Sequence, residues 1–226
     1  MMDARSTDPF EKTEVPAVAR ARQMAEQLFD GGPGSHDWEH TQRVYRLCRD
    51  LGPREGADMV VLSVAALLHD IGRCHQDASR GAVCHAEQGA RMAAGLAADL
   101  PLTEGQKANV VHCVRAHRFR KEPHPDTIEA RVLFDADKLD AIGAVGIARA
   151  YQFAGEVGAR LHNPNHDVSN TRAYTREDTG YREYQVKLRH IQGRMLTDAG
   201  RRVAEGRHHF MTRFFERFLK EIEGQL

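Results

Sequence analysis

The fold of this chain is decided by the stretch Val60-Val61-Leu62-Ser63-Val64-Ala65-Ala66-Leu67-Leu68-His69-Asp70. An apolar run of this kind is typical of a helix inside a core. His69 and Asp70 at its end place an imidazole and a carboxylate where loss of water is costly unless a partner compensates. A divalent metal would compensate for both side chains at once. Gly72 then ends the helix and opens the chain to solvent.

The composition is that of an ordinary globular protein, with 41% hydrophobic and 28% charged residues in a chain of 226. Lys plus Arg and Asp plus Glu both number 32, so the formal charge is zero, which argues against long nucleic acid as a partner. No apolar stretch approaches the ~20 residues that span a bilayer, and we expect no membrane partner. The four cysteines have no C-x-x-C spacing and are expected to be reduced thiols of a cytoplasmic protein.

Hydrophobic periodicity and chain breakers predict an all-α fold, because no segment shows sustained alternation with a period of two. Helices are expected over 15–29, 36–51, 60–70, 85–100, 104–117, 127–137 and, as a C-terminal hairpin, 181–195 and 198–222. Gly52-Pro53 is expected to end the second helix, which Ser35 or Asp37 could cap, and the helix after Thr127 could continue or kink through Tyr151. Residues 73–82 and 161–176 are expected to be loops.

The predicted domain organisation is a single helical bundle. Residues 1–13 are expected to be disordered and 14–226 to form the domain, with a core at about 36–155 and the hairpin at about 180–222. The last helix presents an apolar stripe of Phe210, Phe214, Phe218 and Ile222. This stripe could pack on the core or form a dimer face, so both a monomer and a homodimer stay open.

Four side chains on apolar helical segments form the candidate metal site: His40, His69, Asp70 and Asp137. His40 lies in line with Val44 and Leu47 on one helical face. Two imidazoles and two carboxylates suit a divalent ion such as Mn, Fe, Co, Ni, Mg or Zn. Each residue alone could be a hydrogen-bonded core histidine or a helix-end carboxylate, but the four together favour a metal.

These residues also carry a resemblance to the H…HD…D signature of the HD-domain metal-dependent phosphohydrolases. The matching segments are His40-x-x-Arg43-Val44, Leu68-His69-Asp70-Ile71-Gly72 and Asp135-Ala136-Asp137-Lys138-Leu139-Asp140. Flanking segments at 85–90, 114–121, 143–149 and 187–207 are similar to those of small single-domain bacterial HD proteins, so the likeness covers roughly 18–222. It implies an all-helical core with a metal at its centre, held by His40, His69, Asp70 and Asp137. Asp137 is preferred to Asp135 because the family aspartate follows Ala and precedes a basic residue and Leu-Asp.

The resemblance extends to two further histidines, His85 and His117. Some HD proteins use histidines at such places for a second metal bridged by the HD aspartate, whereas others use them to bind phosphate; a structural role stays open. Asp70 and Glu87 are the candidate catalytic residues, and Glu87 could be a general base or could orient His85.

Several charged residues are candidates for substrate binding or for support of the ligands. Lys138 and Arg149 are about three turns apart, so they share a face if their helix is unbroken. They could bind a second phosphate or a nucleobase, or belong to a solvated basic face, and Lys121 has the same alternatives. Arg43 and Asp140 are expected to support the metal ligands from behind.

The predicted function is a metal-dependent phosphohydrolase that uses a metal-activated water on a small phosphorylated substrate, plausibly a nucleotide. The segment after His69-Asp70 lacks the acidic pair typical of guanosine-tetraphosphate hydrolases. No Gly-Tyr-Pro segment of the cyclic-di-GMP phosphodiesterases is found, and the chain is shorter than the deoxyguanosine-triphosphate triphosphohydrolases. A di-iron oxygenase of the HD type and a non-catalytic nucleotide sensor are the alternatives.

Overall fold

The computed structural model describes residues 14–29, 38–79, 81–118 and 123–226, and in these residues all regular structure is helical. The elements are α1 (Pro16–Phe29), α2 (Trp38–Glu55), α3 (Met59–Leu68), α4 (Arg73–Ala78), α5 (His85–Ala98), α6 (Glu104–Ala116), α7 (Ile128–Asp140), α8 (Gly143–Glu156), α9 (Gly180–Val186), the 3-10 turns η2 (Leu188–His190) and η3 (Gln192–Arg194), and α10 (Asp198–Ile222). The predicted all-α fold is confirmed. The predicted disorder of 1–13 and the candidate caps Ser35 and Asp37 lie outside the described residues.

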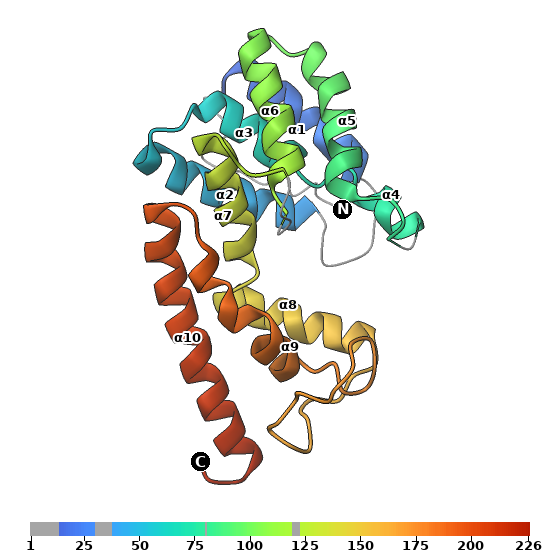
Figure 1. Cartoon of the computed structure of the whole chain (residues 1–226), viewed down its shortest axis with the longest axis vertical. Coiled ribbons are helices and arrows are strands. Elements are labelled where there is room, and N and C mark those ends of the chain that lie inside the picture. Colours follow the sequence, from blue (N-terminus) through green and yellow to red (C-terminus); the bar gives the residue numbers. More distant parts are fainter. Residues whose placement is uncertain (1–13, 30–37, 80, 119–122) are drawn as a thin grey trace, which may run out of the picture.

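Helix α3 is the centre of the core. Every residue from Val61 to Leu68 is buried, because the helix is apolar on all sides and is packed on all sides by α1, α2, α6 and α7 (Figure 1). Asp58 caps its first turn by accepting hydrogen bonds from the amides of Val60 and Val61. The helix ends at Leu68, so His69 and Asp70 enter the turn that follows while still enclosed by neighbouring helices.

Two layers of helices meet at this turn. Helices α5 and α6 pack against each other, α6 also contacts α3, and α2 packs on α7. Local signals start these helices as expected: Thr103 and Gln106 form a capping box for α6, and Thr127 caps α7. In Figure 1, α8, α9 and α10 form the lower part of the molecule below α7, and α10 runs along one side to the C-terminus.

Two helix boundaries near the core differ from the predictions. Helix α2 continues through Pro53, which removes one intrahelical hydrogen bond from its last turn, and the helix ends before Gly56, whose φ is +70°. Residues 73–82, expected to be a loop, contain α4. Its residues are largely polar and none is buried, so hydrophobic periodicity carried no signal for it.

The region after α7 also corrects the predictions. The helix does not continue through Tyr151: it stops at Asp140, and α8 starts at Gly143, where φ is +80° and a Cβ would meet the side chain of Arg207. The expected hairpin arm over 181–195 breaks at Lys187 into η2 and η3. Buried Leu188 and Ile191 stand three residues apart, which matches the 3-10 repeat.

The buried face of α10 is turned by one residue from the predicted stripe. Met211 and Phe215 are buried, and Phe215 stacks on Tyr184 with ring centroids 4.4 Å apart. Phe214 and Phe218 pack partly against the core, and Phe210 is 49% exposed, so only part of the predicted stripe lies against the core.

None of the helices in the described part of the chain combines the length and the apolar character needed to cross a bilayer. Cys48, Cys74, Cys84 and Cys113 are free thiols, as expected.

Candidate metal centre

The structure brings His40, His69 and Asp137 together around one point, although they lie on α2, after α3 and on α7. Nε2 of His40 lies 3.4 Å from Oδ1 of Asp137 and 3.4 Å from Nε2 of His69. Both histidines are essentially inaccessible to solvent, and Asp137 retains 14% exposure of its side chain. The three ligand atoms all lie within 4.8 Å of one another, which suits a single cation.

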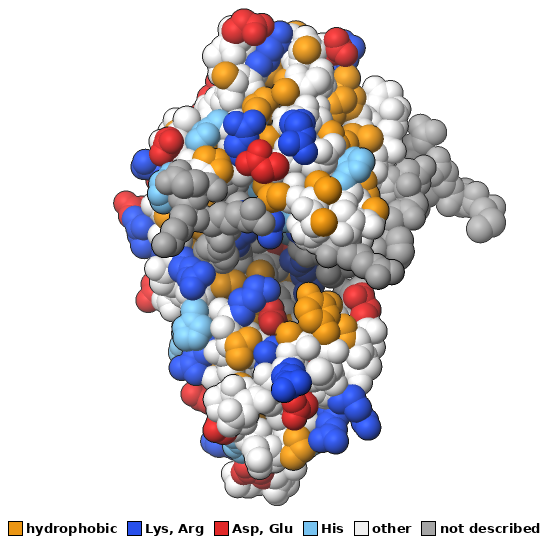
Figure 2. Space-filling model, turned by 45° about the vertical axis from the view of Figure 1, so that its right-hand side comes forward, with side chains coloured by type: hydrophobic (Ala, Val, Ile, Leu, Met, Phe, Trp, Pro, Cys, Tyr) orange, Lys and Arg blue, Asp and Glu red, His pale blue; other side chains and the backbone are white. Residues whose placement is uncertain are grey.

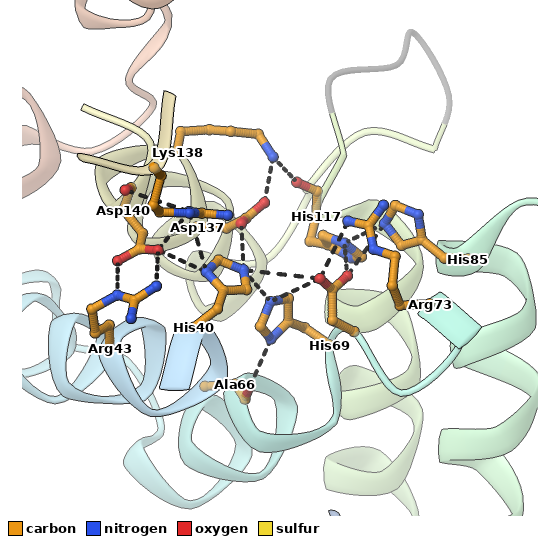
Figure 3. A network of polar contacts seen from close by, with 12 residues as sticks. His40, Arg43, Ala66, His69, Arg73, His85, His117, Asp137, Lys138 and Asp140 are labelled. Carbon is orange, nitrogen blue, oxygen red and sulfur yellow. Dashed lines mark hydrogen bonds and ion pairs between the residues drawn. The ribbon is translucent and has the colours of Figure 1, made fainter. Parts of the chain in front are cut away.

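A second group of potential ligands consists of His85, His117 and Asp70. Nε2 of His85 lies 3.3 Å and Nε2 of His117 lies 3.5 Å from Oδ1 of Asp70, and the two nitrogens are 3.2 Å apart. The other oxygen of Asp70, Oδ2, lies 3.9 Å from Nε2 of His40 and 4.0 Å from Nε2 of His69. Asp70 therefore lies between the two groups and can serve both. Figure 3 shows the four histidines gathered in this cluster.

The four histidines share one hydrogen-bonding arrangement. In each, Nδ1 lies close to an acceptor: Oδ2 of Asp140 at 2.7 Å for His40, the Ala66 carbonyl at 2.8 Å for His69, Oε1 of Gln76 at 2.8 Å for His85, and the Val114 carbonyl at 2.6 Å for His117. In the neutral imidazole the proton is thereby held on Nδ1. Each Nε2 then has its lone pair for a ligand, which is the arrangement found at metal-binding histidines.

The charges around the first group favour a cation. Burial alone would lower the pKa of His40, but Asp137 and Asp140 beside it raise that pKa to about 9. Burial would likewise raise the pKa of Asp137, but Lys138 and His40 hold it well below its usual range. Burial lowers the pKa of His69 to about 4 and that of His85 to about 2, so both are neutral and able to act as ligands near pH 7.

Asp140 and Arg43 lie behind His40, and Lys138 lies beside Asp137. Asp140 is buried behind His40 and accepts hydrogen bonds from Nε of Arg43 at 2.7 Å and from Arg149 at 2.6 Å. Lys138 contacts Asp137 and donates to the carbonyl of His117 at 3.1 Å. The helix is broken after Asp140, but Lys138 and Arg149 line the same cavity, because the chain turns before α8 starts at Gly143.

A cavity of about 730 Å³ adjoins both groups and lies within the size range of sites for small molecules. His85, His117 and Asp137 form part of its wall. The rest of the wall carries six cationic side chains, those of Arg73, Arg118, Lys138, Arg149, Arg182 and Lys187, and four carboxylates, those of Asp77, Glu156, Asp178 and Glu183. In Figure 2 the surface is hollowed between the upper and lower parts of the molecule, where Lys and Arg side chains gather.

Glu87 is not brought into this cluster. Its side chain is 46% exposed and its carboxylate lies 3.5 Å from Nε of Arg115 on α6. The suggestion that it orients His85 is wrong, since Gln76 of α4 takes that position. Sequence reasoning missed Gln76 because it lies in the segment expected to be a loop. Lys121 lies outside the described residues.

Comparisons with known proteins agree with this arrangement. The family model for the HD domain matches residues 37–142. YpgQ of Bacillus subtilis is 32% identical over 217 residues, which cover 93% of this chain and 96% of YpgQ. The crystal structure of YpgQ in complex with ADP has a TM-score of 0.70 at 29% identity, covering 91% of this chain and 94% of that one. A crystal structure of an HD-superfamily hydrolase from Bacillus thuringiensis has a TM-score of 0.73 at 26% identity, covering 92% and 97%.

Proposed function

Because the chain belongs to the HD-domain family, we propose that it is a metal-dependent phosphohydrolase acting on a small phosphorylated substrate, a nucleotide. One observation carries this proposal: Asp70 lies between two pairs of imidazoles, all with Nε2 directed inward, beside a cavity that Arg73, Lys138 and Arg149 help to line. Neutral imidazole and carboxylate form a donor set that fits a divalent ion.

Some residues of the chain would hold metal, and others would bind the substrate. His40, His69, Asp70 and Asp137 would hold one ion, and Asp70 with His85 and His117 a second one or a phosphate oxygen. A divalent ion in such a site lowers the pKa of water and neutralises phosphoryl charge. Asp70 is the candidate catalytic residue because both groups depend on its carboxylate.

The cationic side chains of the cavity supply the rest of the phosphate site. Arg73, Lys138 and Arg149 line the cavity beside the two groups, and each is also held by a carboxylate, which restricts its position. Phosphoryl transfer depends mainly on positioning and on stabilisation of negative charge, which fixed guanidinium and ammonium groups provide. The ADP complex of YpgQ and the volume of the cavity support a nucleotide as the substrate class.

The proposal is tested by metal analysis of the purified protein, followed by a screen for phosphate and pyrophosphate release. Nucleoside mono-, di- and triphosphates are incubated with Mn, Co, Ni and Mg in turn. His69→Ala and Asp70→Asn should lose metal and turnover, whereas His209→Ala, which changes an exposed histidine on α10, should keep both. Metal-loaded protein that releases neither product from any nucleotide would contradict the proposal.

The two ligand groups joined by Asp70 also fit a di-iron oxygenase, which is the second candidate. An oxygenase of this kind would contain iron and consume O₂ without releasing phosphate. The cations that line the cavity beside these groups, Arg73, Lys138 and Arg149, favour the phosphohydrolase. Nucleotide binding without turnover across the same metals would instead indicate a sensor.

A further inference from the structure

Tyr174 has an unusual backbone conformation in the segment between α8 and α9. Its φ is 59°, and among the described residues it is the one non-glycine residue with a positive φ. A bulky side chain is strained there, and such strain persists only where surrounding contacts impose it. Those contacts are present: the amide of Tyr174 donates to Oδ2 of Asp178 at 2.7 Å.

Asp178 is itself well anchored. It is 5% exposed, and its Oδ1 accepts a hydrogen bond from Arg182 of α9 at 2.8 Å. Arg182 also donates to the hydroxyl of Thr171 at 2.8 Å, which ties the residues before Tyr174 to α9. The strained residue therefore lies between two contacts of Arg182, one through buried Asp178 and one through Thr171.

In this conformation the large aromatic ring of Tyr174 gains little stabilisation from burial. Tyr174 is 77% exposed, and its ring lies edge-on to that of Phe153, with centroids 5.8 Å apart and planes at 80°. Both residues line the cavity that adjoins the metal centre. The positive φ of Tyr174 costs free energy, and its exposed ring gains no core packing in return. This indicates that the two rings bind a ligand.

Helix α8 relates this aromatic pair to the phosphate site. Gly146, Arg149, Ala150 and Phe153 line the cavity at the spacing of a single helical face. Arg149 contacts Asp140, the residue behind His40. Phe153 lies one turn further along, about 6 Å on the helix axis, away from the metal centre. One face of α8 therefore presents a cation near the ligands and an aromatic ring beyond it.

We propose that Tyr174 and Phe153 form the stacking site for the nucleobase of the substrate. This inference rests on the proposed function, since it assigns the second end of the nucleotide whose phosphates lie near Lys138 and Arg149. Stacking uses the face that every base has, so the site tolerates different bases and favours purines through their larger area. The base would stack on the exposed face of the strained Tyr174 ring, and Phe153 supports that ring through its edge-on contact.

The test measures binding of ADP and of inorganic pyrophosphate to the metal-loaded full chain by calorimetry. Tyr174→Ala and Tyr174→Gly should weaken ADP binding about tenfold to hundredfold and leave pyrophosphate binding within twofold. Tyr174→Phe keeps the ring and should bind ADP within threefold of the wild type. Phe210→Ala removes an exposed aromatic ring on α10, outside the cavity wall, and serves as the matched control with unchanged ADP affinity.

Folding is checked in the same experiment by thermal denaturation. Glycine adopts a positive φ without strain, so Tyr174→Gly should melt no lower than the wild type while losing ADP affinity. Unchanged ADP affinity in Tyr174→Ala, equal loss of ADP and pyrophosphate binding, or failure of the wild type to bind ADP would each overturn the stacking site. A stacking effect seen without any release of phosphate or pyrophosphate would overturn the proposed function alone.

Discussion

Nδ1 of His40 lies 2.7 Å from Oδ2 of Asp140, a residue 100 positions further along the chain. Asp140 also accepts hydrogen bonds from Arg43 and Arg149, so its carboxylate is fixed from several directions. The imidazole of His40 is consequently held in one tautomer and one orientation, with Nε2 facing Asp137. The geometry of the candidate ligands therefore depends on Asp140, which acts on the site through its contact with His40.

The first prediction concerns this support. Asp140→Asn replaces the charged acceptor behind His40, and metal affinity should fall about 10- to 100-fold, because supporting partners of this kind have effects of that size. Competition with a coloured chelator measures the affinity, and circular dichroism confirms the fold. Asp167→Asn, on the surface between α8 and α9, is the control. Wild-type affinity in Asp140→Asn would show that the charge of Asp140 does not support His40.

The second prediction concerns Glu87. Because its carboxylate faces Arg115 and is half exposed, Glu87→Gln should keep metal content and turnover within about twofold of the wild type. A general base removed in this way would lower turnover by about 10²-fold or more. Steady-state phosphate release at saturating metal distinguishes the two results, and the larger loss would return Glu87 to the mechanism.

The third prediction concerns Asp135, which the sequence set aside as a ligand. Its buried carboxylate accepts hydrogen bonds from the amides of Leu196 and Thr197 at 2.9 and 2.8 Å and from the Thr197 hydroxyl at 2.6 Å, joining α7 to the start of α10. Asp135→Asn replaces one accepting oxygen with an NH₂ group, which would face one of these donors without a hydrogen bond. The substitution should lower the free energy of unfolding by about 2–3 kcal/mol. Urea denaturation measures the loss.

The matched control for Asp135 is Asp198→Asn, in the first turn of the same helix, where the side chain is 73% exposed. An exposed change of this kind should stay within about 0.5 kcal/mol. Equal effects of the two substitutions would mean that Asp135 does not anchor α10.

The fourth prediction concerns pH and the cap of α3. Slight burial of the Asp58 carboxylate would by itself raise its pKa. Hydrogen bonds from Gln106 and from the amides of Val60 and Val61 instead lower that pKa below the ordinary value. The folded state therefore favours the charged carboxylate. Its stabilising contribution is complete above the unfolded pKa of about 3.9 and is lost as the pH falls through the lower folded value.

Asp58→Ala should accordingly cost about 1 kcal/mol of unfolding free energy at pH 7, a typical value for the loss of a cap. The cost should shrink as the pH is lowered from 5 to 3.5. Urea denaturation of both proteins at pH 7, 5 and 3.5 measures it, and a cost that stays constant with pH would show that the charge of Asp58 contributes nothing.

Local sequence patterns predict much of the fold and the residues of the first ligand group. The apolar run before His69 predicts a core helix, and the structure buries that helix on all sides. His40 and His69 could be predicted as neighbours because both lie on apolar faces and match a known motif. The short polar helix α4 and the reversal at Gly143 could not, because neither has an apolar periodicity of its own.

The sequence by itself determined that the chain is helical and that His69 and Asp70 end its most apolar helix, because both depend on residues close together in the chain. The tertiary structure alone decided that Asp70 lies between two imidazole pairs, that Gln76 rather than Glu87 holds His85, and that Tyr174 faces the cavity beside Phe153. These relationships join residues from different helices and loops. Their distances follow from how the helices pack, which no local pattern of apolar residues encodes.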